Sequence, residues 1–104
     1  MRGLLSVSEA RPAVRPFPVD RAWRLSPEVA LRDESFGALA YHYGNRRLVF
    51  LKSRTLVALV TSLDRYPDAA GAMDELVPPA QRAAYERALA RLAASEVIEV
   101  TDAC

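Results

Sequence analysis

Residues 36–53 read FGALAYHYGNRRLVFLKS, and this stretch decides the fold. It contains two runs of alternating side chains, residues 36–43 and 47–52, and Gly44-Asn45 lies between them. Period-two alternation is typical of β-strands, and a two-residue loop with glycine first favours a type II′ hairpin. A shorter alternating run at residues 29–33 precedes them. The sequence therefore predicts three consecutive antiparallel strands.

The predicted hairpin determines which residues stand opposite one another. A loop at 44–45 sets three cross-strand pairs: Tyr43–Arg46, Tyr41–Leu48 and Leu39–Phe50. Side chains two residues apart share a face, so one face gathers four large apolar residues, Leu39, Tyr41, Leu48 and Phe50. The other face is thinner and more mixed: Ala38, Ala40, His42, Arg47, Val49 and Leu51. We expect the large apolar face to meet the core, and the thin face to be half-solvated or covered by the N-terminal segment.

After Lys52 the apolar spacing becomes helical. Ser53 is a candidate N-cap for a first helix, which has an apolar stripe of Leu56, Leu59, Val60 and Leu63 and ends before Pro67. Asp68 is a candidate N-cap for a second helix that ends at residue 76.

Pro78-Pro79 precedes a third helix over residues 81–95, with Tyr85, Ala88, Leu89 and Leu92 on one face. Residues 97–100 favour an extended segment that packs back on the domain. The predicted class is α+β, a three-stranded antiparallel sheet followed by three helices that cover one of its faces.

The composition indicates one folded domain and excludes several classes of protein. The 104 residues are 51% hydrophobic and 26% charged, which is too apolar for a disordered chain. We predict a flexible Arg/Pro-rich arm at 1–22 that lays Phe17 and Trp23 onto the domain, a domain at 23–100 and a tail at 101–104. No apolar run could span a bilayer or serve as a secretory signal, so we expect a cytoplasmic protein without membrane contact.

Groups suited to catalysis are scarce. The chain has one histidine, His42, and one cysteine, Cys104, too few for a disulfide or a cysteine-rich zinc site. We interpret His42 as a surface strand histidine without a task. The acidic residues Asp68, Asp74 and Glu75 are interpreted as a solvated face. The sequence favours binding over catalysis, with no metal and no cofactor.

The third predicted strand lies at an edge of the sheet, where an extended peptide can add as a further strand. Four basic residues flank it: Arg46, Arg47, Lys52 and Arg54. The third helix adds Arg82, Arg87 and Arg91, whereas residues 55–79 hold one basic and four acidic residues. An acidic, extended peptide would complement this charge. The alternative is that the charges only protect the edge against aggregation.

Several motifs resemble the PqqD-like peptide chaperones: WRLSPEVALRDE at 23–34, FGALAY at 36–41 and RLVFLKS at 47–53. Residues 15–76 more closely resemble the MftB family of mycofactocin biosynthesis, through RPF at 15–17, YHYGNRR at 41–47 and FLKS at 50–53. The resemblance implies a RiPP recognition element with a winged-helix-like fold. It also implies a precursor-peptide partner (MftA-like) and a radical S-adenosylmethionine maturase partner (MftC-like).

By this resemblance, the precursor's leader adds beside the third strand and lies against the third helix. The implied peptide-binding residues are Arg46, Arg47, Leu48, Val49, Phe50, Leu51, Lys52, Arg82, Tyr85, Glu86 and Leu89. Proline at Val49 or Leu51 is predicted to remove an edge donor and abolish binding. The free chain is expected to be a monomer or a weak homodimer.

Two other functions use the same features. A winged-helix nucleic-acid binder would place the third helix in a major groove. The net charge of +1 and Glu86 on that helix disfavour nucleic acid as a partner. A small enzyme would have to rely on His42, and we expect no catalysis.

Overall fold

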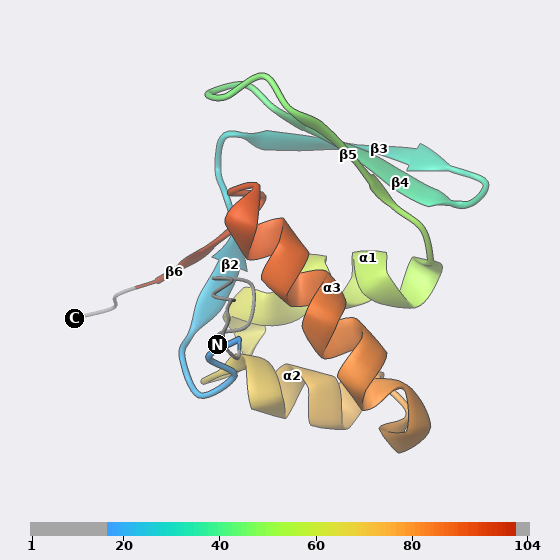
Figure 1. The fold of residues 1–104 in the computed structure, drawn as a ribbon, viewed down its shortest axis with the longest axis vertical. Helices are drawn as coiled ribbons and strands as arrows, with labels where there is room; N and C mark the ends of the chain where they lie inside the picture. The colour runs from blue at the N-terminus through green and yellow to red at the C-terminus, as the bar shows by residue number, and fades with distance from the viewer. Residues whose placement is uncertain (1–16, 102–104) are drawn as a thin grey trace, which may run out of the picture.

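The structure, a computed structural model, describes residues 17–101, so most of the predicted arm and Cys104 lie outside the described residues. The elements, in chain order, are β2 (Trp23–Leu25), β3 (Val29–Glu34), β4 (Gly37–His42), β5 (Leu48–Leu51), α1 (Arg54–Ser62), the 3₁₀ turn η3 (Leu63–Arg65), α2 (Ala69–Leu76), the 3₁₀ turn η4 (Pro79–Gln81), α3 (Arg82–Ala94) and β6 (Ile98–Val100). Figure 1 shows the sheet of β3, β4 and β5 on one side of the three helices. The predicted α+β class and order of elements are confirmed.

The three strands pair antiparallel in the order β3-β4-β5. The predicted pairs Leu39–Phe50 and Tyr41–Leu48 are confirmed. The two-residue type II′ loop is wrong, because the backbone N–H of Arg46 donates to the carbonyl of His42 (2.7 Å) and closes a four-residue loop over 43–46. Arg46, not Gly44, has a positive φ of 64°. The register is unchanged because both loops are centred on the same peptide bond.

The face of the sheet that meets the core is the reverse of the one expected. Ala38, Ala40 and Leu51 are fully buried, whereas Leu48 is 57% exposed and Phe50 is 55% exposed. Helix α1 packs against β4, and its own large buried residues, Leu56, Leu59 and Val60, supply the apolar volume. Small side chains on the sheet allow this close approach. The four large residues Leu39, Tyr41, Leu48 and Phe50 therefore lie on the face away from the core.

Both predicted helix caps are present. Ser53 Oγ accepts the N–H of Leu56 (2.9 Å) at the start of α1, and Asp68 Oδ1 accepts the N–H of Gly71 (2.8 Å) at the start of α2. Each bond satisfies one of the amides that a helix N-terminus leaves without a partner. The predicted stripe of the first helix is buried, including Leu63 in η3.

A second, small sheet joins the two ends of the domain. β2 pairs antiparallel with β6, with Trp23 opposite Val100. Phe17 stacks on Trp23 with ring centroids 4.7 Å apart, as expected for the junction of the arm. The carbonyls of Val19 and Arg21 accept the N–H groups of Ala70 and Ala69 at the start of α2. Residues 17–22 are thus packed on the domain, and the division at residue 22 stays a prediction.

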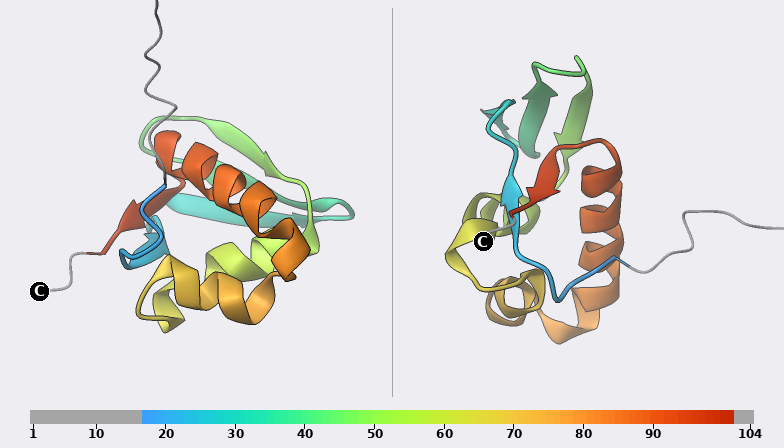
Figure 2. Two further views of the ribbon diagram at one scale, coloured as in Figure 1. Left: turned by 60° about the horizontal axis from the view of Figure 1, so that its bottom comes forward. Right: turned by 90° about the vertical axis from the view of Figure 1, so that its left-hand side faces the viewer.

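Helix α3 runs alongside β5 and crosses over α1 and α2 (Figures 1 and 2). Its buried residues are Ala88, Leu89 and Leu92, in agreement with the predicted apolar face. Among residues 17–101, no helix is long and apolar enough to span a bilayer.

Candidate functional site

The edge of β5 exposes backbone groups at alternate residues. The N–H of His42 donates to the carbonyl of Arg47 (2.9 Å), which identifies this pair as a hydrogen-bonded one. Antiparallel ladders alternate, so Val49 and Leu51 also direct their backbone groups toward β4. The N–H and C=O groups of Leu48 and Phe50 therefore point away from the sheet. The edge donors are therefore the N–H groups of Leu48 and Phe50. Contrary to the prediction, proline at Val49 or Leu51 would remove no edge donor, because the N–H groups of these residues belong to the β4–β5 ladder.

Helix α3 is tied to both ends of β5. Before the strand, Asn45 Nδ2 donates to the carbonyl of Ser95 (3.2 Å) and to Glu96 Oε1 (3.3 Å). After the strand, the hydroxyls of Ser53 and Tyr85 share a hydrogen bond of 2.8 Å. The start of β5 is thus tied to the C-terminal end of α3, and the end of β5 to its N-terminal part. These bonds hold α3 as a wall beside the open edge.

The exposed face of the sheet carries apolar side chains next to this edge. Phe36, Leu48 and Phe50 are exposed, and Phe36 meets Phe50 edge-to-face with ring centroids 5.9 Å apart. A cavity of about 330 Å³ is lined by Phe36, Phe50 and Lys52. Large exposed apolar groups in one place are typical of a binding surface.

The two edges of the sheet differ in charge. Arg46, Arg47, Lys52 and Arg54 beside β5 are exposed and, within the described part of the chain, form no hydrogen bond or ion pair through their side chains. The β3 edge instead carries Glu28, Asp33 and Glu34, with Arg32 paired to Glu34 at 3.1 Å. An acidic strand is therefore attracted to β5 and repelled by β3.

The predicted contact residues of α3 differ in exposure. Arg82 is half-buried and pairs with Asp74, and Tyr85 is half-buried and bonded to Ser53. Glu86 is half-buried on the same side of the helix, one turn after Arg82. Leu89 is fully buried and supports the helix from within the core. Of the four predicted contact residues on α3, Arg82, Tyr85 and Glu86 are therefore accessible to a peptide, and Leu89 is not.

His42 is not a surface residue, and its interpretation as a side chain without a task is wrong. It is 6% exposed, and its Nδ1 accepts the N–H groups of Gly44 (3.0 Å) and Asn45 (3.1 Å). It therefore caps the loop that leads into β5. Asn45, treated in the sequence only as a turn residue, also accepts the N–H of Arg47 through Oδ1 (2.9 Å). The only sequence signal for these roles was a polar side chain directly before or within a tight loop.

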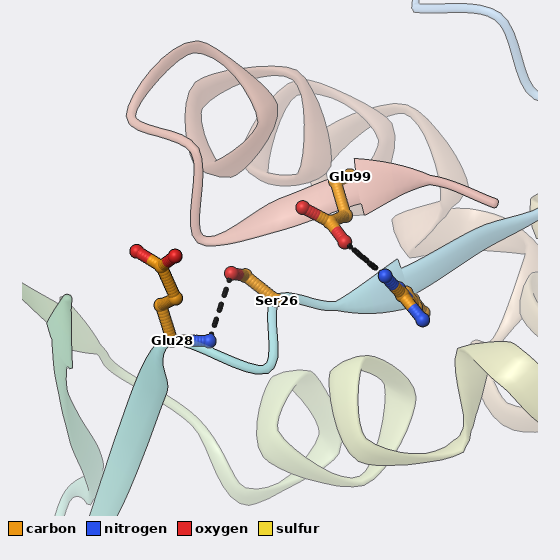
Figure 3. A network of polar contacts seen from close by, with 4 residues as sticks. Ser26, Glu28 and Glu99 are labelled. Atoms are coloured by element: carbon orange, nitrogen blue, oxygen red, sulfur yellow. Dashed lines mark hydrogen bonds and ion pairs between the residues drawn. The ribbon is translucent and has the colours of Figure 1, made fainter. Parts of the chain in front are cut away.

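A second cavity, of about 540 Å³, lies at the other end of the domain. Its lining residues are Trp23, Ser26, Pro27, Glu28, His42, Ala93, Glu96, Ile98 and Glu99. Two of its polar side chains already have partners within the domain, as Figure 3 shows. Ser26 Oγ accepts the N–H of Glu28 (3.1 Å), and Glu99 pairs with Arg24 (2.6 Å). Across residues 17–101, no group of three or more His, Cys, Asp or Glu side chains is placed to hold a metal ion.

Comparison with known proteins gives one consistent result. A family model described as the peptide chaperone MftB family matches residues 22–99. "Peptide chaperone MftB" of Mycobacterium ulcerans (strain Agy99) is 45% identical over 102 residues, which cover 94% of each chain. The proteins of the same name from Mycobacterium tuberculosis (strain ATCC 25618 / H37Rv) and Mycolicibacterium smegmatis (strain ATCC 700084 / mc(2)155) are 53% and 47% identical, over 65% and 79% of this chain and 66% and 81% of theirs. No solved structure matches.

Proposed function

Because the chain belongs to the peptide chaperone MftB family, we propose that it is a non-catalytic peptide chaperone that binds a precursor's leader as an added strand along β5. One observation carries the assignment of the site. The outward N–H and C=O groups of Leu48 and Phe50 lie between Arg47 and Lys52, two basic side chains without a partner in the described residues. Main-chain hydrogen bonds supply affinity in this mode of binding, and the flanking side chains supply selectivity.

The charges decide between the two edges and fit an acidic leader. A peptide strand beside β5 passes Arg46 or Arg47 at one end and Lys52 or Arg54 at the other. Opposite charges guide the encounter and fix the position of the strand. A second copy of this chain is a poorer partner, because two-fold pairing of β5 with itself about Val49 would bring Arg46 opposite Lys52.

Helix α3 forms the second wall of the site. Its ties through Asn45 and Tyr85 keep the helix at a set distance from β5 before the peptide arrives. Less ordering is then required on binding, which favours affinity. Arg82, Tyr85 and Glu86 face the peptide in this arrangement.

The bound peptide is the leader of an MftA-like precursor in mycofactocin biosynthesis, and the chaperone presents it to an MftC-like radical S-adenosylmethionine maturase. The chaperone contributes binding and orientation, and the maturase contributes the chemistry. Holding the leader along β5 leaves the other end of the precursor free to enter the maturase.

Titration of the isotope-labelled chain with an MftA-like precursor peptide tests the site. The amides of Leu48 and Phe50 are expected to shift and to gain protection from hydrogen exchange, because they acquire acceptors. Shifts confined to β3 or to α2 would overturn the assignment.

A matched pair of variants isolates the backbone contribution. Leu48→Pro removes an outward donor and leaves the β4–β5 ladder intact, whereas Leu48→Ala removes the same side chain and keeps the donor. Leu48→Pro is expected to bind the precursor about tenfold more weakly than Leu48→Ala, as for the loss of one or two hydrogen bonds. Equal affinity of the two variants contradicts strand addition. Maturase turnover with and without the chaperone tests the presentation step.

A further inference from the structure

We call the face of the sheet that points away from the core the outer face. The side chains of β5 on this face form a row that is unusual for a solvated strand. Leu48 and Phe50 are both more than half exposed, and Lys52 continues the row at positions two residues apart. Phe36 closes one end by packing edge-to-face on Phe50, and Lys52 completes the cavity of about 330 Å³ at that end. Nothing in the described part of the chain covers these groups.

The same two residues carry the outward backbone groups. A strand that bonds to Leu48 and Phe50 places the residues opposite them in hydrogen-bonded pairs. The side chains of such a pair lie on the same face of the sheet, with their Cβ atoms about 5 Å apart. Alternate residues of the added strand therefore point to the outer face and contact Leu48 and Phe50.

We propose that the outer face of β5 is a specificity site, which selects a peptide strand with apolar residues at positions i+2 and i+4 and acidic residues at positions i and i+6. The apolar pair covers Leu48 and Phe50. One acidic residue meets Lys52, and the other meets Arg46 in the hairpin loop beyond Leu48. This inference rests on the proposed strand addition at β5 and adds the side-chain pattern that the strand must carry.

The pattern follows from charge as well as from shape. Lys52 and Arg46 flank the apolar pair and have no partner within residues 17–101. Because the row is positive at both ends, the required pattern is the same for a parallel and an antiparallel strand. Side chains on one face of the bound peptide contact this row, and side chains on its other face point toward the side of α3.

Synthetic peptides of one composition test the pattern on the unmodified protein. The first peptide carries Glu at i and i+6, Leu at i+2 and i+4, and Thr elsewhere; the second moves the Leu residues to i+3 and i+5. We expect the first peptide to bind about tenfold more tightly, because only its apolar residues share a face with its acids. Equal affinity would overturn the proposed pattern.

Substitutions in the protein test whether the selectivity for the first peptide depends on the side chains of this row. Phe50→Thr keeps a residue that favours strands and is expected to weaken the first peptide about fivefold. Tyr43→Thr is the matched control, because Tyr43 is also an exposed aromatic residue but lies on the side of the hairpin loop away from β5, where its N–H donates to the carbonyl of Glu28. Loss of affinity in the control as large as in Phe50→Thr contradicts the assignment.

A charge exchange supplies an independent readout. Lys52→Glu is expected to weaken the first peptide, and a peptide with Lys in place of one terminal Glu is expected to recover the affinity for this variant. Absence of recovery with either terminal Lys contradicts the pairing. If Leu48→Pro binds more weakly than Leu48→Ala while the peptide pattern and Phe50→Thr have no effect, the specificity site is refuted and the chaperone site stands. If none of these changes matters, both are refuted.

Discussion

At the scale of single residues, His42 shows how a side chain that does not lie on the β5 edge fixes the loop that leads into β5. The buried imidazole accepts the backbone N–H groups of Gly44 and Asn45 through Nδ1, which satisfies two consecutive donors of the loop before β5. The Oδ1 of Asn45 adds a third bond to the same loop, from the N–H of Arg47. These contacts hold Arg46 in its left-handed conformation, which L-residues rarely adopt without support.

Replacing His42 by Ala is expected to lower the free energy of unfolding by about 1–3 kcal/mol, because two amides lose a buried acceptor. The amides of Gly44 and Asn45 should exchange faster, and urea denaturation with hydrogen exchange measures both effects. His42→Asn retains a side-chain acceptor for these amides and serves as the control. Unchanged exchange in His42→Ala would show that the loop does not depend on the imidazole.

At the scale of elements, the sheet is packed through its small face. Ala38 and Ala40 are fully buried under α1, together with Leu51, whereas Leu48 and Phe50 face outward. The apolar volume of this layer is provided by the helix, whose Leu56, Leu59 and Val60 are buried. The exposed large face is thereby left available next to the edge.

This packing predicts opposite effects for two substitutions. Ala40→Leu is expected to destabilise the fold by about 1–3 kcal/mol, because the added volume collides with α1. Leu48→Ala is expected to change the stability by less than about 0.5 kcal/mol, since the side chain is exposed. Chemical denaturation checks both, and a loss of about 2–5 kcal/mol for Leu48→Ala, typical of a core leucine, would contradict the arrangement of faces.

At the scale of the whole molecule, the domain is assembled by contacts between distant segments. β2 pairs with β6 across most of the chain, and α3 is joined to the two ends of β5. The proposed binding site therefore depends on the assembled domain: one wall comes from the hairpin and the other from a helix about forty residues later.

Loosening both ties is expected to free α3. Asn45→Asp keeps the acceptor for Arg47 but loses the donor to Ser95, and Tyr85→Phe loses the hydroxyl bond to Ser53. Each change should cost about 0.5–1.5 kcal/mol, nearly additively because the two ties lie at opposite ends of β5. Hydrogen exchange of α3 should accelerate and precursor affinity should fall. Thr61→Ala, which removes a hydroxyl bonded only to carbonyls of its own helix, is the control.

Local physics allowed much of the fold to be predicted from the sequence. The period of the apolar residues, the caps Ser53 and Asp68 and the register of β4 with β5 depend on neighbours a few residues apart. The register was right although the loop was wrong, since both loops have the same centre. The basic flanks of the edge were also visible in the sequence.

Only the tertiary structure decided which face of the sheet is buried, where His42 lies and which backbone groups of β5 are free. Alternation defines two faces but not the one that a helix covers, and α1 selected the face with the small residues Ala38 and Ala40. Large apolar residues remained on the other face because the helix already fills the core. The expectation that the face with the larger residues meets the core was therefore wrong. That face is exposed instead, and it is the surface that we assign to the peptide.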